Sequence, residues 1–197
     1  MSGYNYNRQP LRLTKNAASL WGELALGPFR EFLRLGSTGS DDELQSIVGF
    51  AGPWVETQCA TSLAERSLVL KVDIADLYIV DAAGDTFIEL PYGPVTSVES
   101  IAWTGGSETS PDLETDTRPE RVKKPSGIAA DALTLTINYT AGRASWSAFT
   151  PEEQFAVMVA TSHFWQNREA VAIGATASPM PFMLTYALAA IDRNPIP

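Results

Sequence analysis

The chain has 197 residues, of which 45% are hydrophobic and 19% are charged, and this is the composition of a folded globular protein. Its net charge is −9, with 14 Lys and Arg against 23 Asp and Glu. This balance argues against a protein that grips nucleic acid, because phosphate contacts need clustered basic residues. An acidic wall that surrounds DNA without holding it stays compatible with the charge.

The cysteine count and the hydropathy pattern exclude further classes. Cys59 is the one cysteine, so an internal disulfide and a cysteine-based zinc site are both excluded. We expect Cys59 to behave as a small buried hydrophobe on the apolar face of a helix. The sequence contains no apolar run long enough to cross a membrane. Residues 1–10 lack the pattern of a secretory signal, so we expect the protein to work in a cytoplasm or inside a particle built there.

The first third of the chain predicts an arm and two helices. Residues 1–26 are polar and weakly patterned, as in an N-terminal arm that docks on a neighbour or folds back on its own core. Gly27-Pro28 predicts a helix over 28–35, because proline suits the first helical turn. Ser40 and Glu43 predict a capping box for a helix over 41–63, with a kink at Pro53. Its buried stripe comprises Leu44, Ile47, Val48, Ala51, Val55, Cys59 and Leu63.

The middle of the chain changes to a period of two, which predicts strands within 67–140. The strands are expected at 68–74, 77–80, 86–90, 95–103 and 133–139. Strict alternation in 95–103 would place Val95, Ser97, Glu99 and Ile101 on one face. Residues 104–127 are rich in glycine, proline and charge and predict a long exposed segment, either a loop or a floppy hairpin.

The C-terminal third predicts one long helix and a tail. Thr150, Pro151 and Glu153 form the strongest helix start in the sequence and open a helix over 151–173. Residues 179–197 form a tail with two prolines before the apolar stretch 182–191. This tail either stays extended and is covered by a neighbouring molecule, or packs back as a last core helix.

The sequence predicts no catalytic, cofactor or metal site. His163 is the one histidine, and it lies beside Phe164 and Trp165 with no partner for a hydrolytic triad. The acidic residues of the 104–127 segment lack the spacing of a calcium loop, and neither common phosphate-binding pattern occurs. We therefore expect a protein that is not an enzyme.

Three segments, taken in order, resemble the head–tail connector (adaptor) family of tailed bacteriophages and gene-transfer-agent particles. The first is residues 32–35, a glycine-serine spacer and the acidic helix start at 41–44. The second is the strand, proline turn and strand of residues 88–98. The third is the aromatic-glycine stretch 139–142, the helix start at 150–151 and the helix end at 164–169. The resemblance covers residues 28 to 174, while the 104–127 segment is longer than the family pattern and the C-terminal end matches it loosely.

The resemblance implies an α+β fold, a small helical bundle with an inserted antiparallel β-sheet and extended N- and C-terminal arms. One compact adaptor domain is expected over 27–178, between the arm 1–26 and the tail 179–197. The implied function is that of a structural virion protein in the neck, a ring of about twelve copies under the portal that extends the DNA channel to the tail. The implied partners are the portal protein, copies of the same chain and a stopper or tail protein. DNA would pass without specific binding, and no membrane is involved.

The resemblance also implies which residues make contacts. The C-terminal tail would reach the portal, with the candidate portal interface formed by Pro181, Phe182, Met183, Leu184, Tyr186, Ile191 and Arg193. Arg168 and Glu169 are the candidate contact between subunits, and the alternative is a solvated pair of little energetic weight. Two other functions stay open. One is another neck protein, such as a stopper or tail-completion protein, and the other is a ligand-binding or enzymatic domain, for which the sequence offers no concave site.

Overall fold

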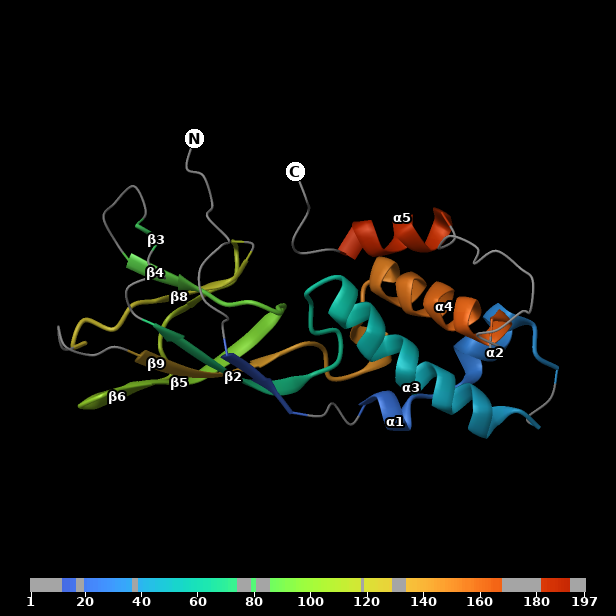
Figure 1. The fold of residues 1–197 in the computed structure, drawn as a ribbon, viewed down its shortest axis with the longest axis horizontal. Coiled ribbons are helices and arrows are strands. Elements are labelled where there is room, and N and C mark those ends of the chain that lie inside the picture. Colours follow the sequence, from blue (N-terminus) through green and yellow to red (C-terminus); the bar gives the residue numbers. More distant parts are fainter. Residues whose placement is uncertain are drawn as a thin grey trace, which may run out of the picture. The chain divides into compact units, whose positions relative to one another are not determined.

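The structure is a computed structural model that describes residues 12–16, 20–36, 39–73, 79–80, 86–117, 119–128, 134–167 and 182–191. The chain forms two compact units where the sequence predicts one domain. The sheet unit comprises Met1–Ala17 and Arg66–Ala141, and the helical unit comprises Ala18–Glu65 and Gly142–Pro197 (Figure 1). A mixed α+β fold with antiparallel sheets inserted between helices is therefore confirmed.

The helical unit is built from five α-helices within the described residues. They are α1 (Leu20–Glu23), α2 (Gly27–Leu33), α3 (Asp41–Gln58), α4 (Pro151–Gln166) and α5 (Phe182–Ile191), and a 3-10 turn, η2 (Trp146–Ala148), precedes α4. The predicted helix over 28–35 ends early because Arg34 takes a left-handed conformation, with φ 55°. The predicted helix over 41–63 ends at Gln58, since Ala60 has φ 45° and turns the chain. The predicted helix over 151–173 ends at Gln166, and residues 168–173 lie outside the described residues.

The described residues 20–26 of the expected N-terminal arm contribute to the core of the helical unit. Trp21 and Leu24 are each only 4% exposed. The indole of Trp21 lies against Gly52, where an added Cβ would be 2.4 Å from the ring. Burying these large apolar side chains stabilises the docked position of α1 on α3, so residues 20–26 fold back on their own core.

The start of α3 differs in detail from the prediction. Ser40 occupies the N-cap position, but its side chain makes no capping hydrogen bond, so the predicted capping box is wrong. Asp41 instead pairs with the guanidinium of Arg30, whose Nε lies 2.8 Å from Oδ1. Pro53 stands inside α3, and the helix continues through it to Gln58.

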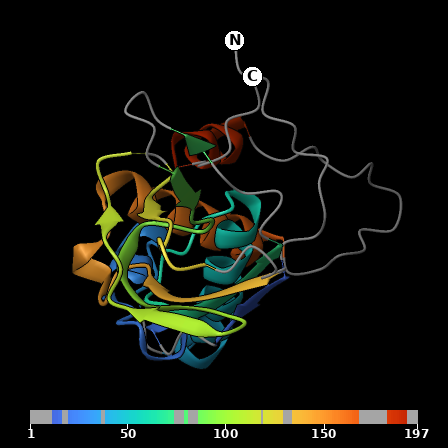
Figure 2. The ribbon, with the colours of Figure 1, turned by 90° about the vertical axis from the view of Figure 1, so that its left-hand side faces the viewer.

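The sheet unit contains two antiparallel sheets (Figure 2). The first sheet has the order β1 (Arg12–Lys15), β2 (Arg66–Asp73), β9 (Thr134–Ala141), β5 (Val95–Trp103) and β6 (Gly106–Thr109). The second has the order β3 (Ile79–Val80), β4 (Thr86–Glu89), β8 (Arg121–Lys123) and β7 (Leu113–Glu114). One core cluster joins residues of both sheets, because Ile88 and Val122 of the second pack with Leu70 and Ile137 of the first. The shared core fixes the two sheets as one unit.

The strand over 95–103 is confirmed, but its alternation is not. Val95, Val98 and Ile101 are the buried positions, and Ser97 and Glu99 are exposed. The register of β5 against β9 shifts between Val95 and Ser97 and again between Val98 and Ser100. Each irregularity adds one residue and changes the phase of the side chains, which a strict period of two cannot anticipate.

The segment 104–127 supplies three strands, β6, β7 and β8, and is more ordered than the predicted loop. The hairpin alternative agrees with β6, which pairs with β5 and is exposed along its length. Val122 is fully buried between β4 and β7. The guanidinium of Arg121 lies 4.0 Å from the centre of the Phe87 ring, and its Nε lies 2.6 Å from Glu114 Oε2. The segment contains few apolar side chains, and it is stabilised instead by strand pairing and by the stacking of Arg121 on Phe87.

The outer face of the first sheet is polar. On β9, the side chains of Thr134, Thr136, Asn138 and Thr140 alternate with four buried residues. The amide of Asn138 donates to the hydroxyl of Ser100 on β5 at 3.0 Å, and Thr140 donates to Glu99 at 2.6 Å. This face is therefore covered by hydroxyl and amide groups that bond across the strands.

Candidate assembly surface of the helical unit

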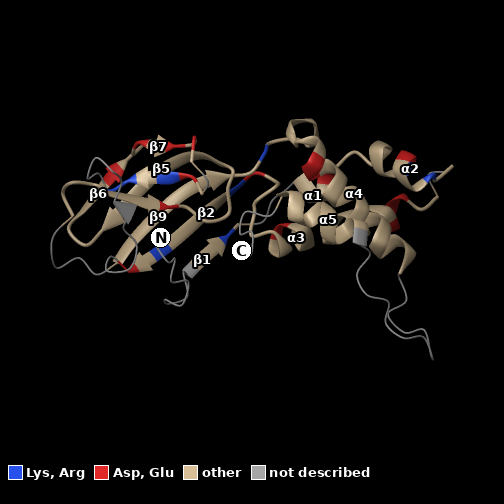
Figure 3. Cartoon of the chain, turned by 90° about the horizontal axis from the view of Figure 1, so that it is seen from above, with Lys and Arg blue, Asp and Glu red and all other residues tan. Residues whose placement is uncertain are grey.

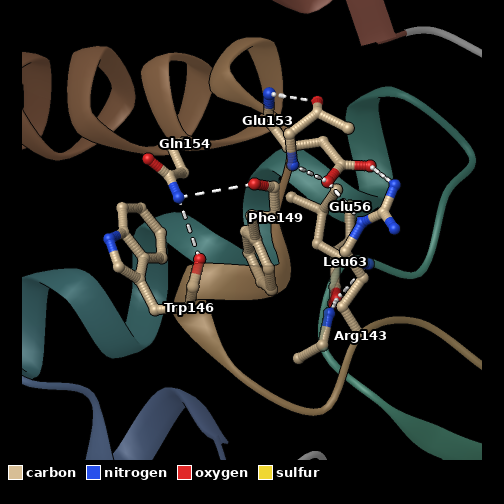
Figure 4. Close-up of polar contacts among 9 residues, drawn as sticks. Glu56, Leu63, Arg143, Trp146, Phe149, Glu153 and Gln154 are labelled. Atoms are coloured by element: carbon tan, nitrogen blue, oxygen red, sulfur yellow. Dashed lines mark hydrogen bonds and ion pairs between the residues drawn. The ribbon is translucent and has the colours of Figure 1, made fainter.

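The start of α4 is held by a network of carboxylate contacts. Thr150 and Glu153 form the predicted capping box, which is confirmed. Arg143 binds the same carboxylate with two hydrogen bonds, of 2.7 Å from Nε and 3.1 Å from Nη2 (Figure 4). Glu153 is only 8% exposed, so its charge is stabilised by these donors. The neighbouring Glu152 is in solvent, and its own backbone N–H, followed by the Thr150 hydroxyl, lowers the pKa of its carboxyl.

A second carboxylate closes the end of α3. Glu56 is 3% exposed, and its Oε1 accepts the backbone N–H groups of Leu63 at 2.8 Å and Ala64 at 3.0 Å. Ala64 also bridges to Arg143, close to the points where the chain leaves the helical unit after Glu65 and returns to it at Gly142. Gly142 is required there: its φ is +99°, and an added Cβ would lie 2.4 Å from the Ala64 carbonyl oxygen. These contacts fix the frame that positions α4.

The apolar C-terminal stretch forms α5, which packs on α4. Leu184 is fully buried and Ala187 is 2% exposed, and both belong to the core of the helical unit. The Cys59 thiol lies 3.5 Å from the carbonyl oxygen of Leu188, and Cys59 is buried as expected. The expectation of an extended tail is therefore wrong for residues 182–191, because the three-four spacing of their apolar side chains buries one helical face.

The structure separates the predicted portal-contact residues into two groups. Met183 and Tyr186 are 59% and 70% exposed and point away from the core. Leu184 is enclosed in the core, so it is unavailable to a partner, and Ile191 is half-buried against that core. The backbone of Phe182 begins α5. Pro181, Arg193, Arg168 and Glu169, and the side chain of Phe182, lie outside the described residues.

A hollow of roughly 200 Å³ lies beside α5. Phe32 of α2 and Met183 of α5 flank the face of α4 that lines it, and the full lining is Phe32, Val159, Ser162, His163, Gln166, Asn167 and Met183. The Phe32 ring also meets the ring of Phe155 edge-on at 6.5 Å. We refer to Phe32, Phe155, Met183, Tyr186 and this hollow as the α2–α4–α5 surface.

The helices α4 and α5 of the α2–α4–α5 surface carry few charged residues. Helix α5 carries no charged residue, and α4 carries only Glu152 and Glu153, in its first turn. In Figure 3 the ribbons of α4 and α5 are accordingly coloured almost entirely as uncharged residues. The amide of Asn167 donates to the His163 carbonyl at 2.8 Å and lies 3.3 Å from Nδ1. Among the described residues that line the hollow, none is a carboxylate or thiol that could act as a triad partner of His163.

A second exposed aromatic cluster was missed by the sequence analysis. The rings of Phe50 and Trp54 on α3 meet the ring of Phe164 edge-on, at 5.0 and 5.3 Å between centroids. Phe50 is 57% exposed. The signal was present, because Phe50 and Trp54 are spaced four apart and lie off the buried stripe of α3.

The described parts of the chain offer no group of three or more His, Cys, Asp or Glu side chains that could hold a metal ion. Across the same residues, every helix is too short or too polar to cross a membrane. In the 104–127 segment, Glu114 pairs with Arg121, and Glu120 is 5% exposed, so these acids are not a solvated cluster.

The fold is similar to that of chains in gene transfer agent (GTA) particles. A chain in the neck of an empty GTA particle, described with sixfold symmetry, matches with a TM-score of 0.66 and 23% identity, covering 91% of this chain and 94% of that one. A chain in the virion of a native GTA particle matches with a TM-score of 0.66 and 24% identity over the same shares. A chain in the neck of a native particle, described with twelvefold symmetry, matches at 0.61 and 20%, covering 91% and 93%. No protein-family model and no curated protein matches the sequence.

Proposed function

We propose that this chain is a structural, non-enzymatic protein of the neck of a gene-transfer-agent-like or tailed-phage-like particle. The observation that carries the proposal is the likeness to neck chains over 91% of this chain and 94% of the other. A match of that extent includes both the helical unit and the sheet unit, so the whole architecture is shared rather than one common motif.

Within the neck, we assign the chain to the adaptor position, a ring of about twelve copies beneath the portal. The three sequence segments that resemble the adaptor family support this assignment. Sixfold and twelvefold symmetry describe the similar necks, and a ring of that kind needs two different surfaces on each subunit. The net charge of −9 suits a channel wall that lets DNA pass without binding it.

The contact with the portal is assigned to the exposed face of α5. Met183 and Tyr186 are large apolar side chains in water on a helix without charge. Aromatic residues and methionine are enriched in the buried centres of protein interfaces. Leu184 supports this face from the core. Pro181, Phe182, Ile191 and Arg193 are proposed to extend the contact, and Arg168 and Glu169 are proposed to lie between neighbouring subunits.

The test uses the purified chain and the portal ring of its own particle in a co-sedimentation titration. The wild-type chain is expected to bind, and Met183→Ser/Tyr186→Ser to weaken the affinity at least about tenfold. The control is Ser67→Ala/Thr136→Ala, which changes two side chains of the polar sheet face. A folded wild-type chain that ignores the portal but binds a tail protein would contradict the adaptor position and favour a stopper or tail-completion protein.

The subunit contact has its own test. Arg168→Glu reverses one charge of the proposed Arg168–Glu169 contact and is expected to leave the monomer folded while weakening the ring on the portal. Glu152→Lys, a charge change of the same size and opposite sign at an exposed position of α4, is the control. Unchanged ring assembly by Arg168→Glu would remove this contact from the account.

A further inference from the structure

The first sheet of the sheet unit has two outer edges, formed by β1 and β6. Within the described residues, β1 pairs only with β2, and β6 only with β5. An edge strand presents unpaired N–H and C=O groups, and these groups can accept a strand from another chain. The side chains at the two edges therefore determine whether a strand of another chain can pair there.

One row of side chains on the inner face ends in a carboxylate at β6. The strand register places five residues side by side across the sheet, namely Leu13, Leu70, Ile137, Ile101 and Glu108. Ile101 is fully buried, and Glu108, directly opposite it, is exposed. Directly opposed residues in an antiparallel pair point to the same face, so Glu108 lies on the face that the core occupies.

The neighbouring row ends in an ammonium at β1. It runs across Lys15, Leu68, Tyr139 and Val98, and the last three are buried. The Nζ of Lys15 lies 3.3 Å from the centre of the Tyr92 ring. Stacking on the ring accommodates the charge at the rim of the core without burying it, because Lys15 stays exposed.

We propose that Lys15 and Glu108 guard the two edges of this sheet against pairing with another chain. A strand added beside β6 would bring its own inner-face side chain against Glu108 and withdraw that carboxylate from water, and a strand added beside β1 would do the same to Lys15. Withdrawing a charged side chain from water is unfavourable. Copies of this chain then meet through surfaces other than these edges, and the inference holds whether or not the neck assignment does.

The first test removes the charge at β6. Glu108→Val keeps a strand-forming residue and is expected to lower the concentration at which the chain self-associates by about tenfold or more, measured by analytical ultracentrifugation. Thr109→Val is the matched control, because Thr109 lies next along the same strand and faces outward. Glu108→Gln, a neutral residue of the same shape, is expected to move the midpoint in the same direction and keeps the test open if the valine variant folds poorly.

Hydrogen exchange locates the new contact. In the Glu108→Val assembly, those backbone amides of Gly106–Thr109 that point away from β5 should become protected. In wild type at the same concentration these outward-pointing amides should exchange freely. At β1, Lys15→Met with Thr14→Val as its control repeats the comparison. The proposal would be overturned if association were unchanged in both charge variants, or if the outward-facing controls associated equally strongly. It would also be overturned if the charge variants lost an assembly that wild type forms, because the edges would then be contacts between copies.

Discussion

The two units of this chain expose different chemistry. All five large hydrophobic side chains that are exposed in the described residues belong to the helical unit, and they are Phe32, Phe50, Phe155, Met183 and Tyr186. The sheet unit presents hydroxyl and amide groups on the outer face of its first sheet and a charge at each edge. Exposed apolar surface favours protein contact, and a polar sheet face with guarded edges opposes it. The difference indicates that contacts with other proteins are concentrated on the helical unit.

The largest expected effect separates the two faces of α5. Leu184→Ala should lower the free energy of unfolding by about 3 kcal/mol, because it leaves a cavity in the core of the helical unit. Tyr186→Ala, two residues away and 70% exposed, should change it by less than about 0.5 kcal/mol. Urea unfolding of both variants measures the difference. Equal losses would mean that α5 does not pack as described.

The next effect concerns the carboxylate at the start of α4. Glu153→Ala removes the capping bond and both bonds to Arg143, and should cost about 2–3 kcal/mol in unfolding free energy. Glu152→Ala is the control at the adjacent, solvent-exposed position, and it should unfold at the wild-type urea midpoint. A wild-type midpoint for Glu153→Ala would contradict the role of this network.

A smaller effect, specific to the sheet unit, depends on pH. Burial, followed by the nearby Tyr92 and Glu120, raises the pKa of the Tyr139 hydroxyl, which donates to the Pro91 carbonyl at 2.5 Å. Above about pH 10 the unfolded chain loses this proton and the folded chain keeps it, so the stability that is present below pH 10 declines as the pH rises. Tyr139→Phe should cost about 1 kcal/mol at pH 7 and show a shallower alkaline decline. Thermal unfolding from pH 8 to 11 tests it, and parallel curves would refute it.

The smallest effect on stability should accompany a large effect on assembly. Phe50→Ser removes the most exposed ring of the cluster formed by Phe50, Trp54 and Phe164, and should shift the melting temperature by no more than a few degrees. If contacts are concentrated on the helical unit, this variant should reduce ring formation on the portal. Ser97→Val, on the polar face of β5, should leave it unchanged. A reversed outcome, with Ser97→Val the damaging change, would place the contacts on the sheet unit.

Local patterns predicted the regular elements well. The start of α4 was predicted from Thr150, Pro151 and Glu153, because a capping box is formed by residues only three positions apart in the sequence. The strands predicted from alternation at 68–74 and 133–139 correspond to β2 and β9, in which buried and less buried side chains alternate. The Ser40 capping box failed because Ser40 has φ −120° and ψ 21°, outside the extended conformation that an N-cap residue typically adopts. The pairing of Asp41 with Arg30, eleven residues away in the chain, is a separate tertiary contact that no local pattern contains.

Features set by distant contacts were the ones missed. The strands β6, β7 and β8 are short and polar and owe their order to pairing partners, as Val122 does to Ile88. The α2–α4–α5 surface brings together Phe32 and Met183, which lie 151 positions apart in the sequence. The sequence marked Met183 and Tyr186 as candidates, but it could not separate them from the buried Leu184, because that choice depends on how α5 packs on α4.

The most direct measurement is electron microscopy, in negative stain, of the portal ring mixed with this chain. The account predicts a second ring on the tail side of the portal, formed by wild type and by Ser67→Ala/Thr136→Ala and lost with Met183→Ser/Tyr186→Ser. Bare portals in the presence of a folded wild-type chain would contradict the adaptor assignment. A ring that forms equally well with the α5 double variant would contradict the placement of the portal contact on that helix.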